Sequence, residues 1–193
     1  NYPIATQGGK SGATPTHNLV SAYEYIGTPD PSDPYANRDP RLAASIVTNG
    51  STWNGRVIDQ SAGGSDDMAK ANASRTGYYL KKFLTDNLNL TQGQMAQHNW
   101  VAYRWAEVLL NYAEAMNEAY GPDAVPAGYS LSARQALQQV RDRASTSLPK
   151  VTASDQESFR DVVKHERRIE LAFEDHRYWD LLRWKDAMEV LNR

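Results

Sequence analysis

The second half of the chain is patterned as a series of amphipathic helices. Between residues 98 and 193, apolar residues recur three and four positions apart, which is the spacing of one face of an α-helix. The four stripes are Ala106, Leu109, Leu110, Ala113, Met116 and Tyr120; Ala133, Ala136, Leu137, Val140 and Ala144; Phe159, Val162, Val163, Ile169 and Phe173; and Leu181, Trp184, Met188 and Leu191. The modest loops between these stripes favour antiparallel packing of successive helices.

Local signals predict where two of these helices begin and end. Gly121-Pro122 follows the first stripe and predicts its C-terminus, because glycine accepts the backbone angles of a helix end and proline cannot continue the helix. Ser154 and Glu157 have the spacing of a capping box, which predicts the start of the third helix.

The first half of the chain is rich in turn residues. Gly, Pro, Ser, Asn and Asp interrupt residues 1–97, and only short elements are predicted there. They are a helix over Thr16–Ile26 with Thr16 as its cap, and short strands over Leu42–Thr48 and Gly55–Asp59. The predicted fold is therefore mainly α: antiparallel helices with long irregular loops and at most a small β element. Residues 1–97 form a loop-rich ligand-side region and residues 98–193 a helical scaffold, together one domain.

Composition excludes several classes of function. The 193 residues contain no cysteine, which removes disulfides, thiol catalysis, iron–sulfur clusters and zinc ribbons. The net charge of -2 argues against nucleic acid as a partner, because phosphate binding requires an excess of basic residues. The longest purely apolar runs, such as Val108-Leu109-Leu110, are far too short to span a membrane.

No known catalytic or metal-binding motif is complete. His165-Glu166 starts like the zinc-protease motif HExxH, but position 169 is isoleucine rather than the second histidine. The sequence also lacks GxSxG, a P-loop and GxGxxG. We therefore expect no enzymatic activity, no metal and no cofactor.

A dense run of charge lies on the third predicted helix and beyond it. Glu166 and Glu170 share a face with Ile169 and the apolar stripe, and an unpaired buried carboxylate costs several kcal/mol. We therefore predict a structural ion-pair network rather than acid–base catalysis. Its members are Arg141, Arg143, Glu166, Glu170, Arg177 and Asp180, with Arg183 as a further candidate partner. The alternative is a glycoside hydrolase that uses a carboxylate pair.

Aromatic residues in the loop half suggest a sugar site. The chain has 11 Tyr and 5 Trp against 3 Phe, and an aromatic ring can cover the apolar face of a pyranose while neighbouring polar groups bind its hydroxyls. The candidate ligand-binding residues are Tyr25, Tyr35, Trp53 and Asn54. The alternative for Trp53 is that it merely pins its loop onto the helices.

Six segments, in order, resemble the SusD/RagB family of nutrient-binding proteins. In the second half they are RWAEVLLNYAEA at residues 104–115, VRDRA at 140–144, and ERRIELAFE followed by RYWDLLRW at 166–184. In the first half, residues 15–20, 37–41 and 76–83 are similar to further family segments. One departure is Asp175, which stands where the family commonly has glycine.

The resemblance implies a function and a location. Such proteins are lipid-anchored on the extracellular face of the outer membrane, bind oligosaccharides or peptides without cleaving them, and deliver them to a SusC-like TonB-dependent transporter. The family's proteins are much longer, so this sequence resembles their C-terminal part, with the lipid-bearing cysteine and a tetratricopeptide-like half lying outside it. The alternative is a docking fragment, for the transporter or for that other half, with a peptide rather than a glycan as ligand.

Overall fold

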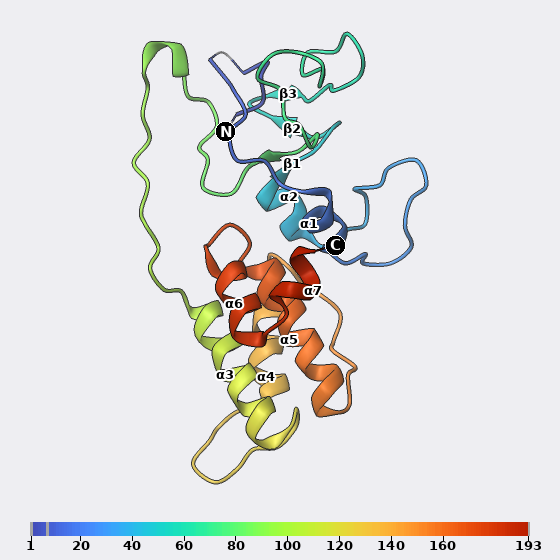
Figure 1. Ribbon diagram of the computed structural model, residues 1–193, viewed down its shortest axis with the longest axis vertical. Helices are drawn as coiled ribbons and strands as arrows, with labels where there is room; N and C mark the ends of the chain where they lie inside the picture. Colours follow the sequence, from blue (N-terminus) through green and yellow to red (C-terminus); the bar gives the residue numbers. More distant parts are fainter. Residues whose placement is uncertain (1, 7, 193) are drawn as a thin grey trace. The chain divides into compact units, whose positions relative to one another are not determined.

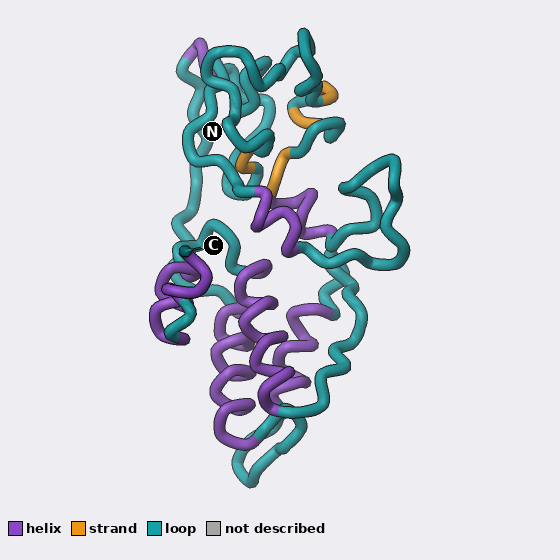
Figure 2. The backbone as a smooth tube through the Cα atoms, turned by 45° about the vertical axis from the view of Figure 1, so that its right-hand side comes forward, coloured by secondary structure: helices purple, strands orange, loops and turns teal. Residues whose placement is uncertain are grey.

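The computed structural model describes residues 2–6 and 8–192, and its backbone divides into two compact units. One unit ends at Trp100 and the other begins at Val101. Figure 1 and Figure 2 show helices dominating the second unit and loops dominating the first. The prediction of a mainly α fold with very little β structure is confirmed. Among residues 2–6 and 8–192, no helix combines the length and hydrophobicity required to span a bilayer.

The second unit is built from helices. They are α3 (Trp105–Tyr120), α4 (Ala133–Arg141), α5 (Gln156–Glu170), α6 (His176–Trp184) and α7 (Ala187–Leu191). Hydrogen bonds fix their directions. The Asn117 side chain donates to the Gln156 carbonyl at 2.9 Å, so the end of α3 lies beside the start of α5. The Arg134 amide donates to the Pro122 carbonyl at 2.9 Å, so α4 starts near the end of α3. Both α4 and α5 therefore run antiparallel to α3.

The predicted apolar stripes meet in the core of this unit. Side chains from α3, α4 and α5 form one buried cluster, which includes Leu109, Leu110, Ala113, Met116, Ala136, Leu137, Val140, Phe159 and Val163. Several of its members are alanine, and these small side chains let the helices approach closely. The helical period of the sequence thus identifies the core of this unit correctly.

The structure corrects some predicted helix ends. The first long helix ends at Gly121 as predicted, with a φ of 82°. However, the α5 cap is Asp155, whose side chain accepts from the Ser158 amide at 2.9 Å, so the predicted capping box of Ser154 and Glu157 is wrong. Aspartate caps a helix as well as serine does, and the two residues are adjacent in the chain.

Left-handed residues break the last two stripes. The α5 helix ends at Glu170, and Phe173 and Asp175 follow with φ of 66° and 62°. Phe173 therefore does not continue the third stripe as predicted. Lys185, with a φ of 63°, splits the fourth predicted helix into α6 and α7. Such residues cost conformational energy and give little warning in a periodic sequence.

The first unit has only short elements. They are α1 (His17–Ala22), α2 (Pro40–Ser45), β1 (Ile46–Val47), β2 (Thr52–Trp53), β3 (Arg56–Val57), β4 (Tyr79–Leu80) and the 3₁₀ turn η1 (Leu90–Gln92). β1 pairs antiparallel with β4, and β2 pairs antiparallel with β3. Thr16 caps α1 as predicted, although α1 stops at Ala22 rather than at Ile26.

The predicted strand over Leu42–Thr48 is mostly helix. Asp39 caps α2 by accepting a hydrogen bond from the Arg41 amide at 2.9 Å, and Pro40 occupies the first helical position. Proline favours that position because its missing N–H has no helical partner there in any case. Only Ile46 and Val47 are extended, so the cap and the proline outweigh the apolar run.

A buried ion pair ties the loops of the first unit together. The Asp66 side chain is fully buried and accepts from Arg56 Nη1 at 2.5 Å and Nη2 at 2.8 Å. It also accepts from the Ala5 amide at 3.2 Å, which attaches the start of the chain. Burial alone would raise the pKa of Asp66, but the hydrogen bonds from Arg56, Ser65 and Ala5 outweigh burial and lower it.

We predict that Asp66→Asn reduces the stability of the first unit in a pH-dependent way. Because the folded pKa of Asp66 lies below its unfolded value near 3.9, the carboxylate contributes its full stability above about pH 5. The expected loss there is about 1–3 kcal/mol. As the pH falls through the folded pKa, the stability gap between wild type and Asp66→Asn closes. Urea unfolding from pH 7 to pH 2.5 measures the gap, and a constant gap contradicts the prediction.

Candidate functional site

A closed loop projects from the first unit between α1 and α2. Its two ends are held together by backbone hydrogen bonds, from the Asp39 amide to the Glu24 carbonyl at 2.7 Å and from the Ile26 amide to the Asn37 carbonyl at 2.6 Å. Tyr25 and Arg38 form an antiparallel bridge between these bonds. We call residues 24–39 the Tyr25 loop. Its stem fixes the direction in which the rest of the loop leaves the fold.

The tip of the Tyr25 loop is preorganised. Pro29, Pro31 and Pro34 each fix one backbone angle, which reduces the freedom of the unfolded loop. The Asp30 carboxylate accepts from the Ser32 amide at 2.8 Å and from the Ser32 hydroxyl at 2.7 Å. These bonds lower the pKa of Asp30. Asp33 accepts in the same way from the Tyr35 amide at 2.9 Å. A rigid loop loses little entropy when it binds a ligand.

Arg38 fastens this loop to α1. Its guanidinium donates to the Val20 carbonyl at 2.6 Å and to the Tyr23 carbonyl at 2.8 Å, both at the C-terminal end of α1. It also donates to the Pro34 carbonyl at the far side of the loop, at 3.2 Å. The Arg38 carbon Cζ lies 4.3 Å from the centre of the Tyr25 ring, so the guanidinium stacks on that ring.

Two of the predicted sugar-binding residues lie on this loop. Tyr25 remains 39% exposed, and its hydroxyl donates to the Pro34 carbonyl at 3.2 Å. The Tyr35 ring is half-buried and meets the Tyr78 ring edge-on, with centroids 6.5 Å apart. Burial and the Tyr78 hydroxyl raise the pKa of Tyr35 to about 12. Tyr35 therefore keeps its proton at physiological pH and can donate a hydrogen bond.

Tyr78 and His17 complete the aromatic cluster. The Tyr78 hydroxyl lies 2.8 Å from His17 Nδ1, and the two rings stack with centroids 6.0 Å apart. Neither these two residues nor Arg38 was among the predicted site residues. Tyr78 lies 53 positions after Tyr25 in the chain, so sequence proximity gave no signal. The only available hint was that all three occur in segments that resemble one family.

The other two predicted ligand residues lie elsewhere. Trp53 is only 3% exposed and packs in a core cluster with Val47, Ile58 and Tyr79. A sugar cannot stack on this buried ring, so the prediction of Trp53 as a binding residue is wrong. The alternative, an anchoring role, fits the geometry better, although the anchor point is the core of the first unit and not a helix.

Asn54 is a turn residue rather than a ligand residue. With Gly55 it forms the tight turn between β2 and β3, with φ of 51° and 71°. An Asn-Gly pair with positive φ at both positions is the preferred hairpin turn. The Asn54 side chain also accepts from the Asn87 amide at 2.7 Å, which holds a neighbouring loop. Both facts give Asn54 a local structural role.

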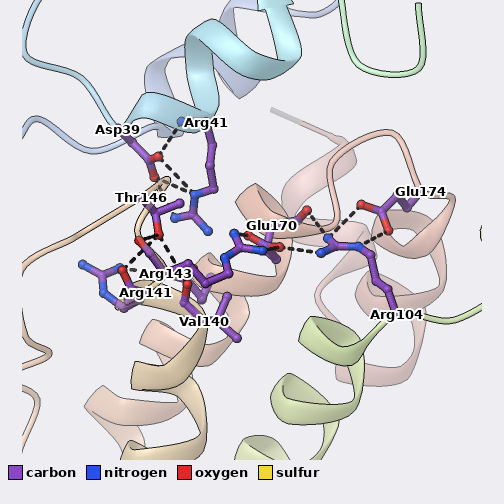
Figure 3. Close-up of polar contacts among 10 residues, drawn as sticks. Asp39, Arg41, Arg104, Val140, Arg141, Arg143, Thr146, Glu170 and Glu174 are labelled. Atoms are coloured by element: carbon purple, nitrogen blue, oxygen red, sulfur yellow. Dashed lines mark hydrogen bonds and ion pairs between the residues drawn. The ribbon is translucent and has the colours of Figure 1, made fainter.

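In the second unit, Glu170 joins three helices through two arginines (Figure 3). Arg104, just before α3, donates to Glu170 Oε1 at 2.5 Å, and Arg143, just after α4, donates to Glu170 Oε2 at 2.7 Å. Arg104 also donates to Glu174 at 2.7 Å. The Thr146 hydroxyl donates to the Arg141 carbonyl at 3.0 Å, which shapes the turn carrying Arg143. Glu170 is buried, so the two guanidinium groups compensate for its lost hydration.

Two further ion-pair groups lie in the second unit, one between α4 and α5 and one between α5 and α6. Arg141 donates to Glu166 at 2.8 Å, and both side chains are buried. Asp180 accepts from Arg167 at 2.9 Å and from Arg183 at 2.9 Å. Five of the six predicted network residues are thus paired.

Arg177 is the exception and requires a correction. Among the described residues it has no hydrogen bond and no ion pair within 4 Å, although Asp180 and Asp186 act on it at longer range. Burial and the nearby Arg168 lower its pKa. Its place in the helix explains the difference, because Asp180 is already bound by Arg167 and Arg183.

This geometry disfavours acid–base catalysis by the network. Both oxygens of Glu170 are bound by arginine, and Glu166 is buried against Arg141. Within residues 2–6 and 8–192, no three His, Asp or Glu residues lie close enough to hold a metal ion. The ion pairs hold helices together, and the Tyr25 loop presents an aromatic surface. The first feature belongs to the second unit and the second feature to the first unit.

Comparison with known proteins gives the family. The SusD family model matches residues 1–193. Two SusD-like proteins of Formosa agariphila are similar in sequence: P25 is 30% identical over 168 residues and P2 is 32% identical over 160 residues. These matches cover 78% and 79% of this chain but only 30% of each relative. The chain belongs to the SusD family and spans about a third of the length of these relatives.

Solved structures agree with this assignment. A SusD-like carbohydrate binding protein from Bacteroides fragilis, BF0978, superposes with a TM-score of 0.74 and 34% identity over 92% of this chain and 36% of that protein. A second SusD-like protein from the same organism, BF3747, gives a TM-score of 0.72 and 31% identity over 91% of this chain and 37% of that protein. The Gly that the family commonly has at position 175 is explained by the left-handed backbone of Asp175.

We predict that Trp53→Ala lowers stability rather than removing a binding contact. Deleting a buried indole from a packed core costs about 3–5 kcal/mol. Trp53→Phe should cost less, because the buried indole N–H has no hydrogen-bond partner among the described residues. Urea unfolding followed by circular dichroism measures both. The control is Trp100→Ala, an exposed tryptophan whose loss should change the midpoint little. Equal effects of Trp53→Ala and Trp100→Ala would refute the core assignment.

We also predict that Glu170→Gln destabilises the second unit by about 1–3 kcal/mol, because it leaves Arg104 and Arg143 without their shared anion. The matched control is Glu118→Gln, which breaks an exposed pair with Arg160 and should cost less than about 1 kcal/mol. Urea midpoints measure the difference. A Glu170→Gln midpoint equal to that of Glu118→Gln would mean that Glu170 behaves as a solvated residue.

Proposed function

We propose that the chain belongs to a non-catalytic carbohydrate-binding protein and that the Tyr25 loop is its ligand-contacting part. The observation that carries the proposal is the exposed Tyr25 ring, braced by Arg38 on a loop that prolines and aspartate turns hold in one shape. Loops on a rigid scaffold are the usual place for binding residues. The relative named as a carbohydrate binding protein supports the ligand class.

The chemistry of the loop suits a sugar. A tyrosine ring covers the apolar face of a pyranose, and polar groups around it bind the hydroxyls. Tyr35, with its raised pKa, supplies a hydroxyl that stays protonated, and the Asp30 carboxylate, with its lowered pKa, supplies an acceptor that stays ionised. Donor and acceptor thus lie on one short loop beside an aromatic surface.

We further propose that binding serves nutrient uptake at the cell surface. In this proposal the protein is attached to the extracellular face of the outer membrane and passes its oligosaccharide to a SusC-like TonB-dependent transporter without cleaving it. Family membership supports this role. The bound state of the carboxylates in the second unit supports binding without catalysis.

The test is isothermal titration of the chain against a panel of oligosaccharides and, separately, a panel of peptides. We expect oligosaccharide binding that weakens at least tenfold with Tyr25→Ala, a change of about 1.4 kcal/mol, because the stacking surface is lost. Tyr25→Phe keeps the ring and loses only the bond to Pro34, so its loss should be smaller. Tyr103→Ala removes an exposed tyrosine outside the Tyr25 loop and is the control.

Three results would contradict parts of the proposal. Wild-type affinity of Tyr25→Ala for oligosaccharide would move the site away from this loop. Binding of peptides but not of oligosaccharides would replace the ligand class. Release of reducing sugar from a polysaccharide would overturn the non-catalytic assignment. Circular dichroism of each variant shows whether a loss of binding comes from misfolding.

A further inference from the structure

Three side chains beside the Tyr25 loop form a hydrogen-bonded series that the proposed function does not use. The Ser21 hydroxyl lies 3.1 Å from His17 Nε2, and the Tyr78 hydroxyl lies 2.8 Å from His17 Nδ1. His17 and Ser21 are four residues apart on α1, so their side chains are neighbours on the helix surface. Both ring nitrogens of His17 are therefore engaged, each by a hydroxyl group. We call Ser21, His17 and Tyr78 the His17 relay.

Both ends of the His17 relay adjoin the candidate site. Ser21 is exposed and directly follows Val20, whose carbonyl accepts a hydrogen bond from Arg38 of the Tyr25 loop. At the other end, Tyr78 is buried and its ring meets Tyr35 of the same loop edge-on. Burial and a hydrogen bond with Tyr78 raise the pKa of Tyr35 to about 12, so the hydrogen-bonded series continues into the Tyr25 loop.

The protonation state of the imidazole fixes the number of free donors in the His17 relay. A neutral imidazole has one N–H donor and one bare nitrogen, whereas a protonated imidazole has two donors. With a neutral ring, the bare nitrogen accepts the proton of one hydroxyl, and only the other hydroxyl keeps its proton for a further contact. With a protonated ring, both nitrogens donate, so Ser21 and Tyr78 both keep their protons. Protonation of His17 therefore adds one hydrogen-bond donor.

The added donor belongs to the tyrosine side of the relay. A phenol is more acidic than a serine hydroxyl and is the stronger donor, so with a neutral ring Tyr78 donates to Nδ1 and Nε2–H donates to Ser21. The Tyr78 oxygen is then the acceptor for the Tyr35 proton. When His17 is protonated, Nδ1–H donates to Tyr78, and Tyr78 donates to the Tyr35 oxygen. The Tyr35 proton is then free for a ligand.

We propose that His17 is a positioning residue of the Tyr25 loop, because its protonation state determines whether Tyr35 donates inward to Tyr78 or outward to an oligosaccharide. The inference rests on the proposed function, since it assigns the direction of the donor that Tyr35 offers to a sugar. It suits an uncharged oligosaccharide, whose hydroxyl oxygens accept hydrogen bonds.

The charged groups around the relay are few. Asp33 raises the pKa of Tyr35 and Arg38 lowers it, so these two groups of the Tyr25 loop oppose each other. Apart from His17, α1 carries no acidic or basic residue. In the part of the chain that the structure describes, His17 forms hydrogen bonds only with Ser21 and Tyr78, and it forms no ion pair. Histidine side chains ordinarily change charge between about pH 5 and pH 8, which sets the range of the test.

The test is isothermal titration of the 193-residue chain with maltohexaose, cellohexaose, xylohexaose and mannohexaose at about pH 5.5 and pH 8. We expect any of these sugars that binds to do so about fivefold more tightly at the lower pH, which is the effect of one added hydrogen bond. Titration near pH 6.5 in two buffers of different ionisation enthalpy should show that binding takes up protons.

Variants separate the relay from a merely structural role. His17→Gln has one donor and one acceptor group at every pH, so it should bind as wild type does at pH 8, with no gain at pH 5.5 and no proton uptake. Tyr78→Phe keeps the ring contacts, loses the hydroxyl and should also lose the pH dependence. The matched control is His98→Gln, which removes an exposed histidine packed on Phe83 and should keep both effects.

The outcomes distinguish this inference from the proposed function. Sugar binding with equal affinity at both pH values, or a pH dependence that persists in His17→Gln, would overturn the inference and leave the proposed function standing. If none of the four sugars binds, the proposed function is contradicted for them, and nitrogen NMR of the His17 ring decides the relay. A single neutral tautomer at pH 8, lost in Tyr78→Phe and in Ser21→Ala, supports the relay. Averaged tautomers in wild type would overturn it.

Discussion

The second unit depends on a buried carboxylate with two guanidinium partners. Glu170 lies at the end of α5, Arg104 precedes α3 and Arg143 follows α4, so three chain segments meet at one pair of oxygen atoms. The buried carboxylate must keep its arginine partners, because without them nothing compensates for the hydration that it lost on burial. The ends of the three helices therefore cannot move independently. The left-handed residues Phe173 and Asp175 lie just after Glu170 in the chain and precede α6.

Polar side-chain contacts also determine how α6 lies beside α3. The contacts of Glu107 with His176 and of Glu114 with Arg183 are each two helical turns apart on their own helix. The two helices therefore run in the same direction and in matching register. Arg167 of α5 connects them by binding both Asn111 and Asp180. Long charged side chains thus hold α6 together with one buried leucine, Leu181.

The sequence predicts the parts of this fold that depend on long periodic patterns. The stripes over α3, α4 and α5 identify the helices and their core, because apolar residues repeat three and four positions apart over several turns. The short elements fail for the opposite reason. In Leu42–Thr48 a single cap, Asp39, and one proline decide between helix and strand, and in Ser154-Asp155 two adjacent caps compete. Positive φ at Phe173 and Lys185 has no signal in the sequence, because neither residue type is one that commonly adopts it.

The candidate site is less predictable, because burial separates residues that look alike in sequence. Trp53 and Tyr25 are both aromatic residues in turn-rich segments, yet one lies in a core and the other beside solvent. The difference comes from partners far along the chain, Tyr79 for Trp53 and Arg38 for Tyr25. The segment RYWDLLRW shows the same separation within one helix. Asp180 and Arg183 bind each other and neighbouring helices. Tyr178, Trp179 and Leu182 are exposed. The segment therefore carries ion pairs on one side of the helix and exposed aromatic residues on the other, a division that its sequence alone does not reveal.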